Sequence, residues 1–137
     1  DHALKLQVAN ATHTAMVHFM ALSRMRDTAA CIIHTFIMTY LNSLIDQDIA
    51  PLAAKVRLRE LGIDEDEVYS VWRDWSKRLT HPHFGLSTLF VSQNAFQKLG
   101  TRLLPSVRAA LRERQTPSTL MAFATAALLR FITPSER

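Results

Sequence analysis

The chain has 137 residues, of which 48% are apolar and 20% are charged, with a formal net charge of +4. This length suits one domain with a single core, and so large an apolar fraction excludes an intrinsically disordered chain. Basic residues are spread along the sequence rather than gathered in a stripe, so no nucleic-acid partner is expected. No apolar run is long enough to span a membrane, so no membrane partner is expected.

Glycine is scarce, with only three residues, and long stretches consist of good helix formers. The apolar periodicity and the stop signals predict helices over 10–24, 27–47, 52–61, 64–78, 85–98, 105–114 and 116–129. The predicted fold is therefore all-α, a compact bundle of about six or seven helices. The short apolar stretch 4–9 is expected to be a strand or an extended lead-in to the first helix.

Several residues mark where these helices begin and end. Asp27 is expected to cap the second helix, and Pro51 to mark a break or a new helix start. Gly62 is expected to stop the third helix. Asp64 and Glu67 form the pattern of a capping box at the start of the fourth.

The apolar residues of the first helices indicate a packed core. Met16 and Met20 lie on one predicted helix face, and Trp72 and Trp75 are expected to anchor the core or a domain interface. Cys31 is the only cysteine and lies in an apolar run, so it is expected to be buried. A single free cysteine favours a cytoplasmic location.

The most specific chemical pattern is an amine, an amide and an imidazole within nine residues: Lys5, Asn10 and His13. If 4–9 is extended and Asn10 caps the first helix, the three side chains converge where the two segments meet. A lysine can accept a hydroxyl proton, and an amide and an imidazole can stabilise a developing alkoxide. The alternative is structural: a surface lysine, an N-cap and an interior histidine.

The spacing Lys5-x4-Asn10-x2-His13 resembles the K-x4-N-x2-H signature of the mannitol dehydrogenase family of long-chain polyol dehydrogenases. The resemblance implies that Lys5 is the general acid/base and that Asn10 and His13 contact the reacting oxygen. It also implies a sugar substrate and NAD or NADP as cofactor, bound mainly by an N-terminal nucleotide-binding domain.

A second stretch of the chain supports the same resemblance. Residues 78–82, R-L-T-H-P, look like the family's R-F-x-N-P, and residues 92–106 are similar to a pattern of the tagaturonate reductase (altronate oxidoreductase) branch. The resemblance implies that the substrate contacts Arg78, Asn94, Lys98 and Arg102. Leu79, His81 and Leu86 depart from the family pattern, which leaves the exact substrate open.

Residues 1–137 are thus expected to be the helical substrate-binding and catalytic domain of a longer dehydrogenase, with the Rossmann domain absent from this chain. Two alternatives stay open, a sugar-phosphate dehydrogenase domain and a non-catalytic helical interaction module. His81 and His83 lack a third ligand at metal-site spacing, so no metal is expected.

Overall fold

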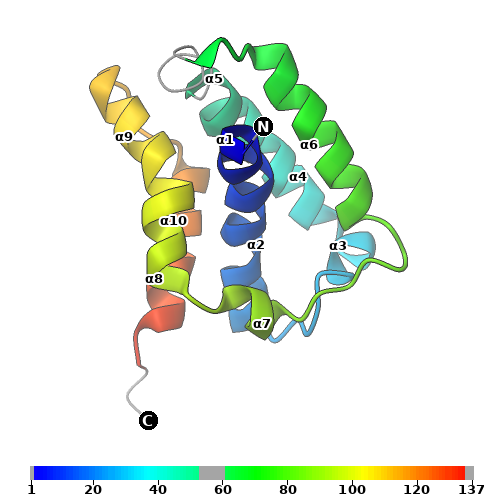
Figure 1. Cartoon of the computed structure of the whole chain (residues 1–137). Helices are drawn as coiled ribbons and strands as arrows, with labels where there is room; N and C mark the ends of the chain where they lie inside the picture. Colours follow the sequence, from blue (N-terminus) through cyan, green and yellow to red (C-terminus); the bar gives the residue numbers. More distant parts are fainter. Residues whose placement is uncertain (1, 53–60, 135–137) are drawn as a thin grey trace.

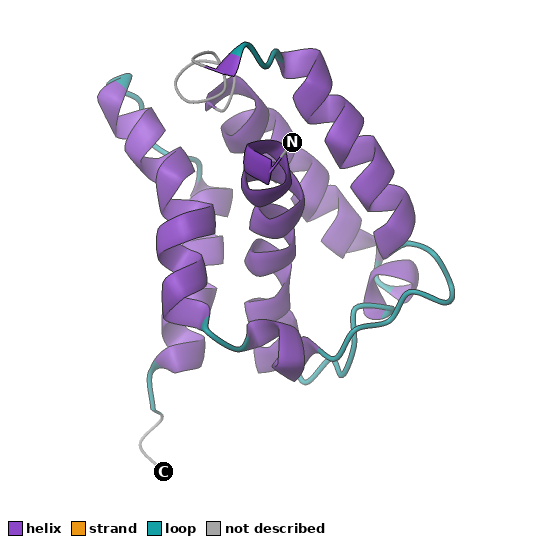
Figure 2. Cartoon of the chain, in the orientation of Figure 1, coloured by secondary structure: helices purple, strands orange, loops and turns teal. Residues whose placement is uncertain are grey.

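The computed structural model describes residues 2–52 and 61–134. Within these ranges the chain is helical and contains no β-strand (Figure 2). The one β-bridge found there joins Asp27 and Ser87 in antiparallel fashion and ties together two loops at one end of the bundle. The all-α prediction is therefore confirmed.

The described elements follow one another along the chain as α-helices and short π-helical turns, the latter labelled η. They are α1 (His2–Leu4), η1 (Lys5–Asn10), α2 (Ala11–Leu22), α3 (Ala30–Ile33), α4 (Thr35–Leu44), η2 (Ile45–Ile49), α5 (Ala50–Leu52), α6 (Glu65–Leu79), α7 (Thr88–Ser92), α8 (Ala95–Lys98), η5 (Leu99–Leu103), α9 (Leu104–Arg112) and α10 (Thr119–Ile132). Figure 1 shows η1 and α2 in the middle, with α4 and α6 on one side and the segment from α8 to α9 on the other.

Helix α2 is the centre of the core. Every residue from Ala11 to Met20 is buried, which is the behaviour of a helix that is covered on all sides. Met16 and Met20 are fully buried, as predicted. The rings of Phe19, Tyr40 and Phe123 pack against one another at centroid distances of 5.4–5.7 Å, and so join α2 to α4 and α10.

The expectation of a strand or extended lead-in at 4–9 is wrong, because these residues are helical and run directly into α2. Leu4, Val8, Ala11 and Ala15 are buried at helical spacing and extend the apolar face of α2 backwards. Asn10 has helical backbone angles (φ −74°, ψ −31°) and makes no side-chain cap, so it is not the predicted N-cap.

The predicted second helix, 27–47, is divided in two. His34 has φ −102° and ψ 83°, which ends α3 before α4 begins. Asp27 does not cap a long helix but accepts a hydrogen bond from the Ala29 backbone N–H at 2.8 Å. Pro51 lies inside α5, which continues from η2 without a break. The helix predicted over 52–61 lies almost wholly outside the described residues, and Gly62 beyond it takes φ +71°.

Helix α6 begins as predicted. The Glu67 backbone N–H donates to the Asp64 carboxylate at 2.9 Å, and the Asp64 N–H donates to the Glu67 carboxylate at 3.0 Å. This reciprocal capping box satisfies two backbone donors that the first helical turn leaves free. The fourth predicted helix is therefore confirmed, and its Trp72 is buried in the core with its indole N–H bonded to Asn42 at 2.9 Å.

The predicted fifth helix, 85–98, is also divided. Asn94 takes the left-handed conformation (φ 57°, ψ 36°), which no helix interior accepts, and it separates α7 from α8. The last helix, α10, begins at Thr119, three residues later than predicted. Ser118 caps it, with its hydroxyl oxygen accepting from the Met121 N–H at 3.3 Å, while buried Asp48 accepts from the Ser118 N–H at 2.9 Å.

Candidate functional site

The π-helical turn η1 determines where Lys5, Asn10 and His13 project. An ideal α-helix advances about 100° per residue, which would send Asn10 roughly 140° away from Lys5. A π-helical turn, with i→i+5 bonds, advances roughly 80° per residue. By this register the three side chains leave the helix within roughly 60° of one another. We therefore expect one side of η1 and α2 to carry all three.

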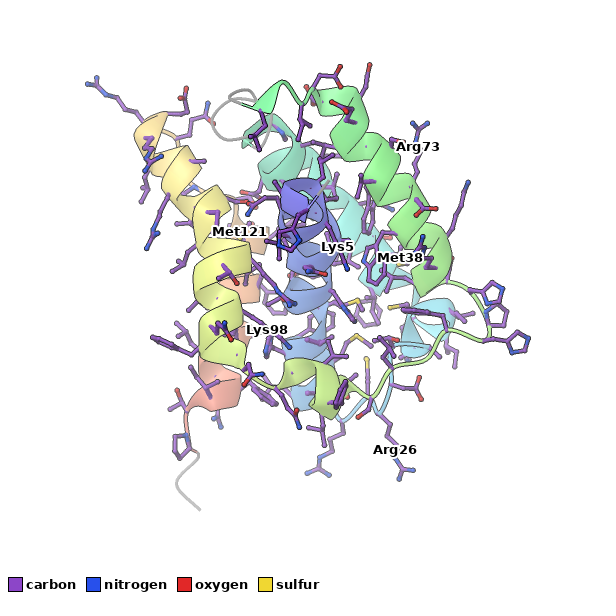
Figure 3. All side chains as sticks on the ribbon, in the orientation of Figure 1. Lys5, Arg26, Met38, Arg73, Lys98 and Met121 are labelled. Carbon is purple, nitrogen blue, oxygen red and sulfur yellow. The ribbon has the colours of Figure 1, made fainter. Side chains whose placement is uncertain are left out.

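These three side chains differ in their exposure to solvent. Lys5 is exposed, Asn10 is partly exposed, and His13 is only 7% exposed. Figure 3 shows Lys5 on η1 and Lys98 on the neighbouring α8. The amine therefore lies at the surface end of the group and the imidazole at its buried end.

His13 is held as a neutral imidazole. Burial, and after it the positive charges of Arg102 and Lys98, lowers the pKa of His13 to about 4. Its Nε2 atom is buried and has no hydrogen-bond partner within residues 2–52 and 61–134, although such atoms are almost always paired in folded proteins. The ring packs edge-on against Trp75 at 5.4 Å. A neutral imidazole with an unpaired ring nitrogen can form a hydrogen bond with a substrate oxygen.

Lys98 and Arg102 are partly buried, and the charge of each acts on this imidazole. The Lys98 amine donates to the Val91 backbone carbonyl, and the Arg102 guanidinium donates to the Thr14 hydroxyl at 3.1 Å. Burial lowers the pKa of both cations, and each lowers the pKa of His13. The structure thus brings two of the four predicted substrate residues together with His13.

Thr14 was not among the predicted site residues. Its side chain is fully buried in α2, and its hydroxyl is the oxygen that Arg102 contacts. Its backbone carbonyl accepts a hydrogen bond from Nδ1 of His18 at 2.9 Å. A polar residue within the apolar run of the central helix was the only signal in the sequence.

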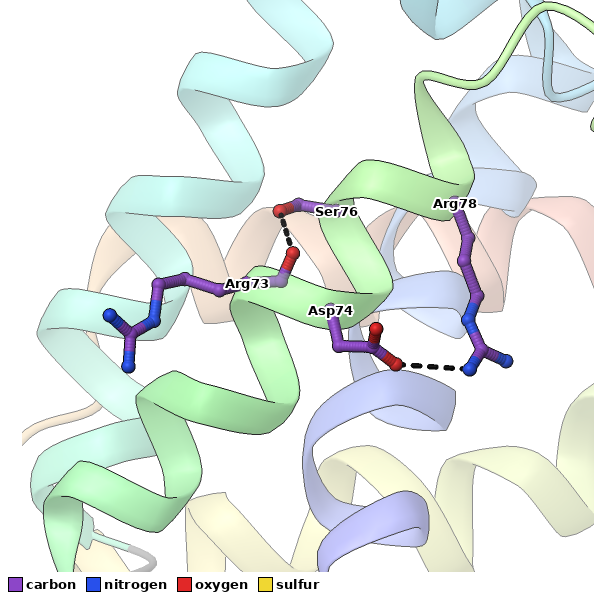
Figure 4. A network of polar contacts seen from close by, with 4 residues as sticks. All are labelled: Arg73, Asp74, Ser76 and Arg78. Atoms are coloured by element: carbon purple, nitrogen blue, oxygen red, sulfur yellow. Dashed lines mark hydrogen bonds and ion pairs between the residues drawn. The ribbon is translucent and has the colours of Figure 1, made fainter.

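Arg78 lies on another surface. Its guanidinium forms an ion pair with Asp74 at 3.0 Å, and both side chains are more than 60% exposed (Figure 4). It lines an open depression of about 430 Å³ together with Asp74, Lys77, His81, His83 and Phe84. Phe84 packs on Trp75, and Trp75 packs on His13, so two rings stand between this depression and the imidazole. The structure does not bring Arg78 into contact with the other predicted residues.

Asn94 is exposed and makes no side-chain cap. What it contributes is its left-handed backbone, which turns the chain between α7 and α8. This turn lets Lys98 reach back to the carbonyl of Val91 in α7. Its observed part in the site is therefore to shape the backbone, and a contact with substrate stays a prediction.

Two general features of the described part of the chain bear on the chemistry of the site. Among residues 2–52 and 61–134, no three histidine, cysteine or acidic side chains gather where they could hold a metal ion. None of the helices described there is long and apolar enough to cross a membrane.

Comparison with known proteins identifies the family. The family model for the mannitol dehydrogenase C-terminal domain matches residues 2–137, which is nearly the whole chain. A search of curated proteins gave no match. Since the family match covers far more than half of the chain, the chain belongs to the mannitol dehydrogenase family, and its residues 2–137 match that family's C-terminal domain.

Proposed function

We propose that the chain is the substrate-binding and catalytic domain of an NAD(P)-dependent oxidoreductase. The reaction interconverts a sugar alcohol or aldonate and the corresponding keto-sugar or keto-sugar acid. The observation that carries this proposal is the neutral His13, on which the charges of Lys98 and Arg102 act and whose Nε2 has no hydrogen-bond partner among the described residues. The family match supports an oxidoreductase of the polyol dehydrogenase type.

In the proposed reaction Lys5 accepts the proton of the substrate hydroxyl while the carbon bearing it loses a hydride and becomes a carbonyl. Asn10 and His13 hold the oxygen through their N–H groups as negative charge develops on it. The π-helical register of η1 supports this division of roles, because such a register is expected to bring the three side chains to one side of the helix. In the reverse direction Lys5 returns the proton.

A nicotinamide cofactor, when bound, accepts or supplies the hydride. The exposed amine, the amide and the free imidazole nitrogen fit the substrate side of such a transfer. We assign the binding of the dinucleotide mainly to a separate N-terminal nucleotide-binding domain, because the chain has no glycine-rich phosphate loop. A cytoplasmic location stays a prediction from the single free cysteine.

The substrate end distant from the reacting carbon is assigned to Lys98 and Arg102. A planar guanidinium suits a carboxylate and an ammonium serves as a point charge, so a sugar acid is the preferred substrate class. The tagaturonate reductase branch is the specific form of this proposal. A sugar phosphate would use the same two cations, so it is the second candidate.

The test uses the chain joined to its nucleotide-binding domain and follows NADH absorbance with a keto-uronate, fructose or fructose 6-phosphate. Lys5→Met is expected to lower kcat by at least a hundredfold, the low end of what a general acid/base contributes. Lys77→Met removes another exposed lysine and serves as the matched control. Full activity of the Lys5 variant would contradict the assignment. A preference for fructose 6-phosphate would favour the second candidate, a sugar phosphate, as the substrate class in place of a sugar acid.

The 137-residue chain by itself is expected to show no NAD-dependent turnover, because the dinucleotide would have no phosphate-binding turn. The same NADH assay on the purified chain measures this. Turnover by the chain alone would contradict the assignment of dinucleotide binding to a separate domain. It would leave the proposed roles of Lys5 and His13 unchanged.

A further inference from the structure

We infer that Thr14 is a positioning residue, whose hydroxyl fixes the Arg102 guanidinium beside His13 so that it can bind an anionic group of the substrate. The nature of that group rests on the proposed function. The positioning itself rests on the contact between α2 and η5 alone.

The first observation is the nature of the oxygen that Arg102 contacts. Thr14 is neutral, so the hydrogen bond at 3.1 Å fixes the guanidinium without cancelling its charge. Lys98 is held in the same way, by the neutral backbone carbonyl of Val91. Arg78 gives the contrast, since its charge is met by the carboxylate of Asp74. The pair Lys98 and Arg102 therefore keeps its positive charge for a ligand.

The second observation is that Thr14 is unlike its neighbour Thr12. Both side chains are fully buried in α2. The Thr12 hydroxyl donates to the carbonyls of Val8 and Ala9 at 2.8 and 3.0 Å, one turn back along its own helical segment. The Thr14 hydroxyl instead reaches a residue 88 positions away in the sequence. Thr14 thus joins α2 to the distant η5, whereas Thr12 bonds only within the continuous helical segment of η1 and α2.

The third observation is that the positive charge of Arg102 lowers the pKa of His13. Arg102 from η5 and Lys98 from α8 are the two cations whose charge acts on the imidazole, and Trp75 from α6 covers its edge. A guanidinium has five N–H donors, and the one given to Thr14 leaves the others free to bind two oxygens of a carboxylate. An arginine fixed in advance loses less freedom on binding than a mobile one, which raises affinity.

The experiment compares three variants of the full chain by nuclear magnetic resonance. Thr14→Val keeps the shape of the side chain and removes the hydroxyl, Thr14→Ser restores the oxygen, and Thr12→Val removes a buried hydroxyl that does not touch Arg102. The two readouts are the titration of the His13 imidazole and the binding of gluconate. A purely structural role for Thr14 would move neither readout once folding is confirmed by circular dichroism.

Thr14→Val is expected to raise the pKa of His13 by about half a unit or more, because Arg102 then turns toward solvent. Gluconate binding should weaken roughly tenfold, the effect of losing a well-placed charge-assisted contact. Thr14→Ser and Thr12→Val should keep both values of the unmodified chain. An unchanged His13 titration in folded Thr14→Val, or an equal change in Thr12→Val, overturns the inference.

Arg102→Met decides the matter if Thr14→Val does not fold, because the Arg102 side chain is only partly buried. This variant should raise the pKa of His13 at least as much, and an unchanged titration would refute the positioning. If gluconate fails to bind the unmodified chain while His13 responds as expected, the positioning stands and the sugar-acid part of the proposed function fails.

Discussion

Replacing His13 by glutamine is expected to reduce the loss of stability that the chain undergoes as the pH falls. The imidazole is 7% exposed, and burial together with Arg102 and Lys98 lowers its pKa to about 4 in the folded chain, against 6.5 for an ordinary histidine. When the pH falls through 6.5, the unfolded chain therefore binds a proton on His13 before the folded chain does. Stability is full above this value and is lost as the pH falls toward 4.

The magnitude follows from the two pKa values. A gap between 6.5 and about 4 corresponds to about 3 kcal/mol over the whole range, of which about 2 kcal/mol is lost by about pH 5. Domains of this kind are stable by about 5–15 kcal/mol in all, so one histidine accounts for a measurable share. The direction of the effect is the same for His18, whose pKa burial also lowers.

Urea unfolding followed by tryptophan fluorescence, at several pH values between about 5 and 7.5, measures this loss. Carboxylates also titrate near the acidic end, so the relevant quantity is the difference between the unmodified chain and His13→Gln. His34→Gln removes an exposed histidine and serves as the matched control. If the unmodified chain and His13→Gln lose stability in parallel, His13 is not a buried neutral group and the description of the site is wrong.

Three further predictions concern the scaffold. Asp64→Ala removes the carboxylate that accepts from the Glu67 N–H in the capping box and should cost about 1 kcal/mol in thermal unfolding, whereas Asp66→Ala in the same helical turn should cost much less. Asn94→Gly should keep the free energy of unfolding of the chain. Asn94→Val should lower it by about 1–2 kcal/mol, because a β-branched residue resists φ 57°. Equal melting temperatures of the two variants would contradict this prediction. Cys31 is 2% exposed and burial raises its pKa to about 11, so an aromatic disulfide reagent should label it only in urea; rapid labelling of the native chain would count against the packing of α3.

Much of the scaffold could be predicted because its signals are local. The capping box at Asp64, the buried Met16 and Met20 and the buried Cys31 each follow from a short pattern whose physics does not depend on the rest of the fold. The breaks at His34 and Asn94 could not be predicted in this way. Both residues are tolerated inside helices, and tertiary contacts decide the backbone there: the loop 25–28 is bonded to 86–88 at one end of the bundle, with Thr88 N–H to the Arg26 carbonyl at 2.9 Å.

The residues of the candidate site were predicted from the sequence, but the groups that hold their side chains in place were not. Lys98 and Arg102 were assigned to the substrate by resemblance, and the structure adds the oxygens that fix them, a backbone carbonyl and the hydroxyl of Thr14. Neither oxygen has a signature in a single sequence, because a carbonyl is present at every residue and threonine is common in helices. Arg78 was also assigned to the substrate by resemblance to a family motif. In the folded chain it lies on another surface and forms an ion pair with the Asp74 carboxylate.

The spacing of Lys5, Asn10 and His13 shows why a helical period alone would miss such a group. Offsets of five and eight fit an α-helix poorly, and the short apolar stretch 4–9 was interpreted as a strand or an extended lead-in to the first helix. A continuous helix satisfies the same offsets once η1 adds a π-helical turn, because one turn then holds more residues and the register rotates. The second such turn in this region, η5, carries Arg102 toward Thr14. Lys5, Asn10 and Arg102 thus lie in segments where the helix departs from the regular period, and a search for regular periodicity misses such segments.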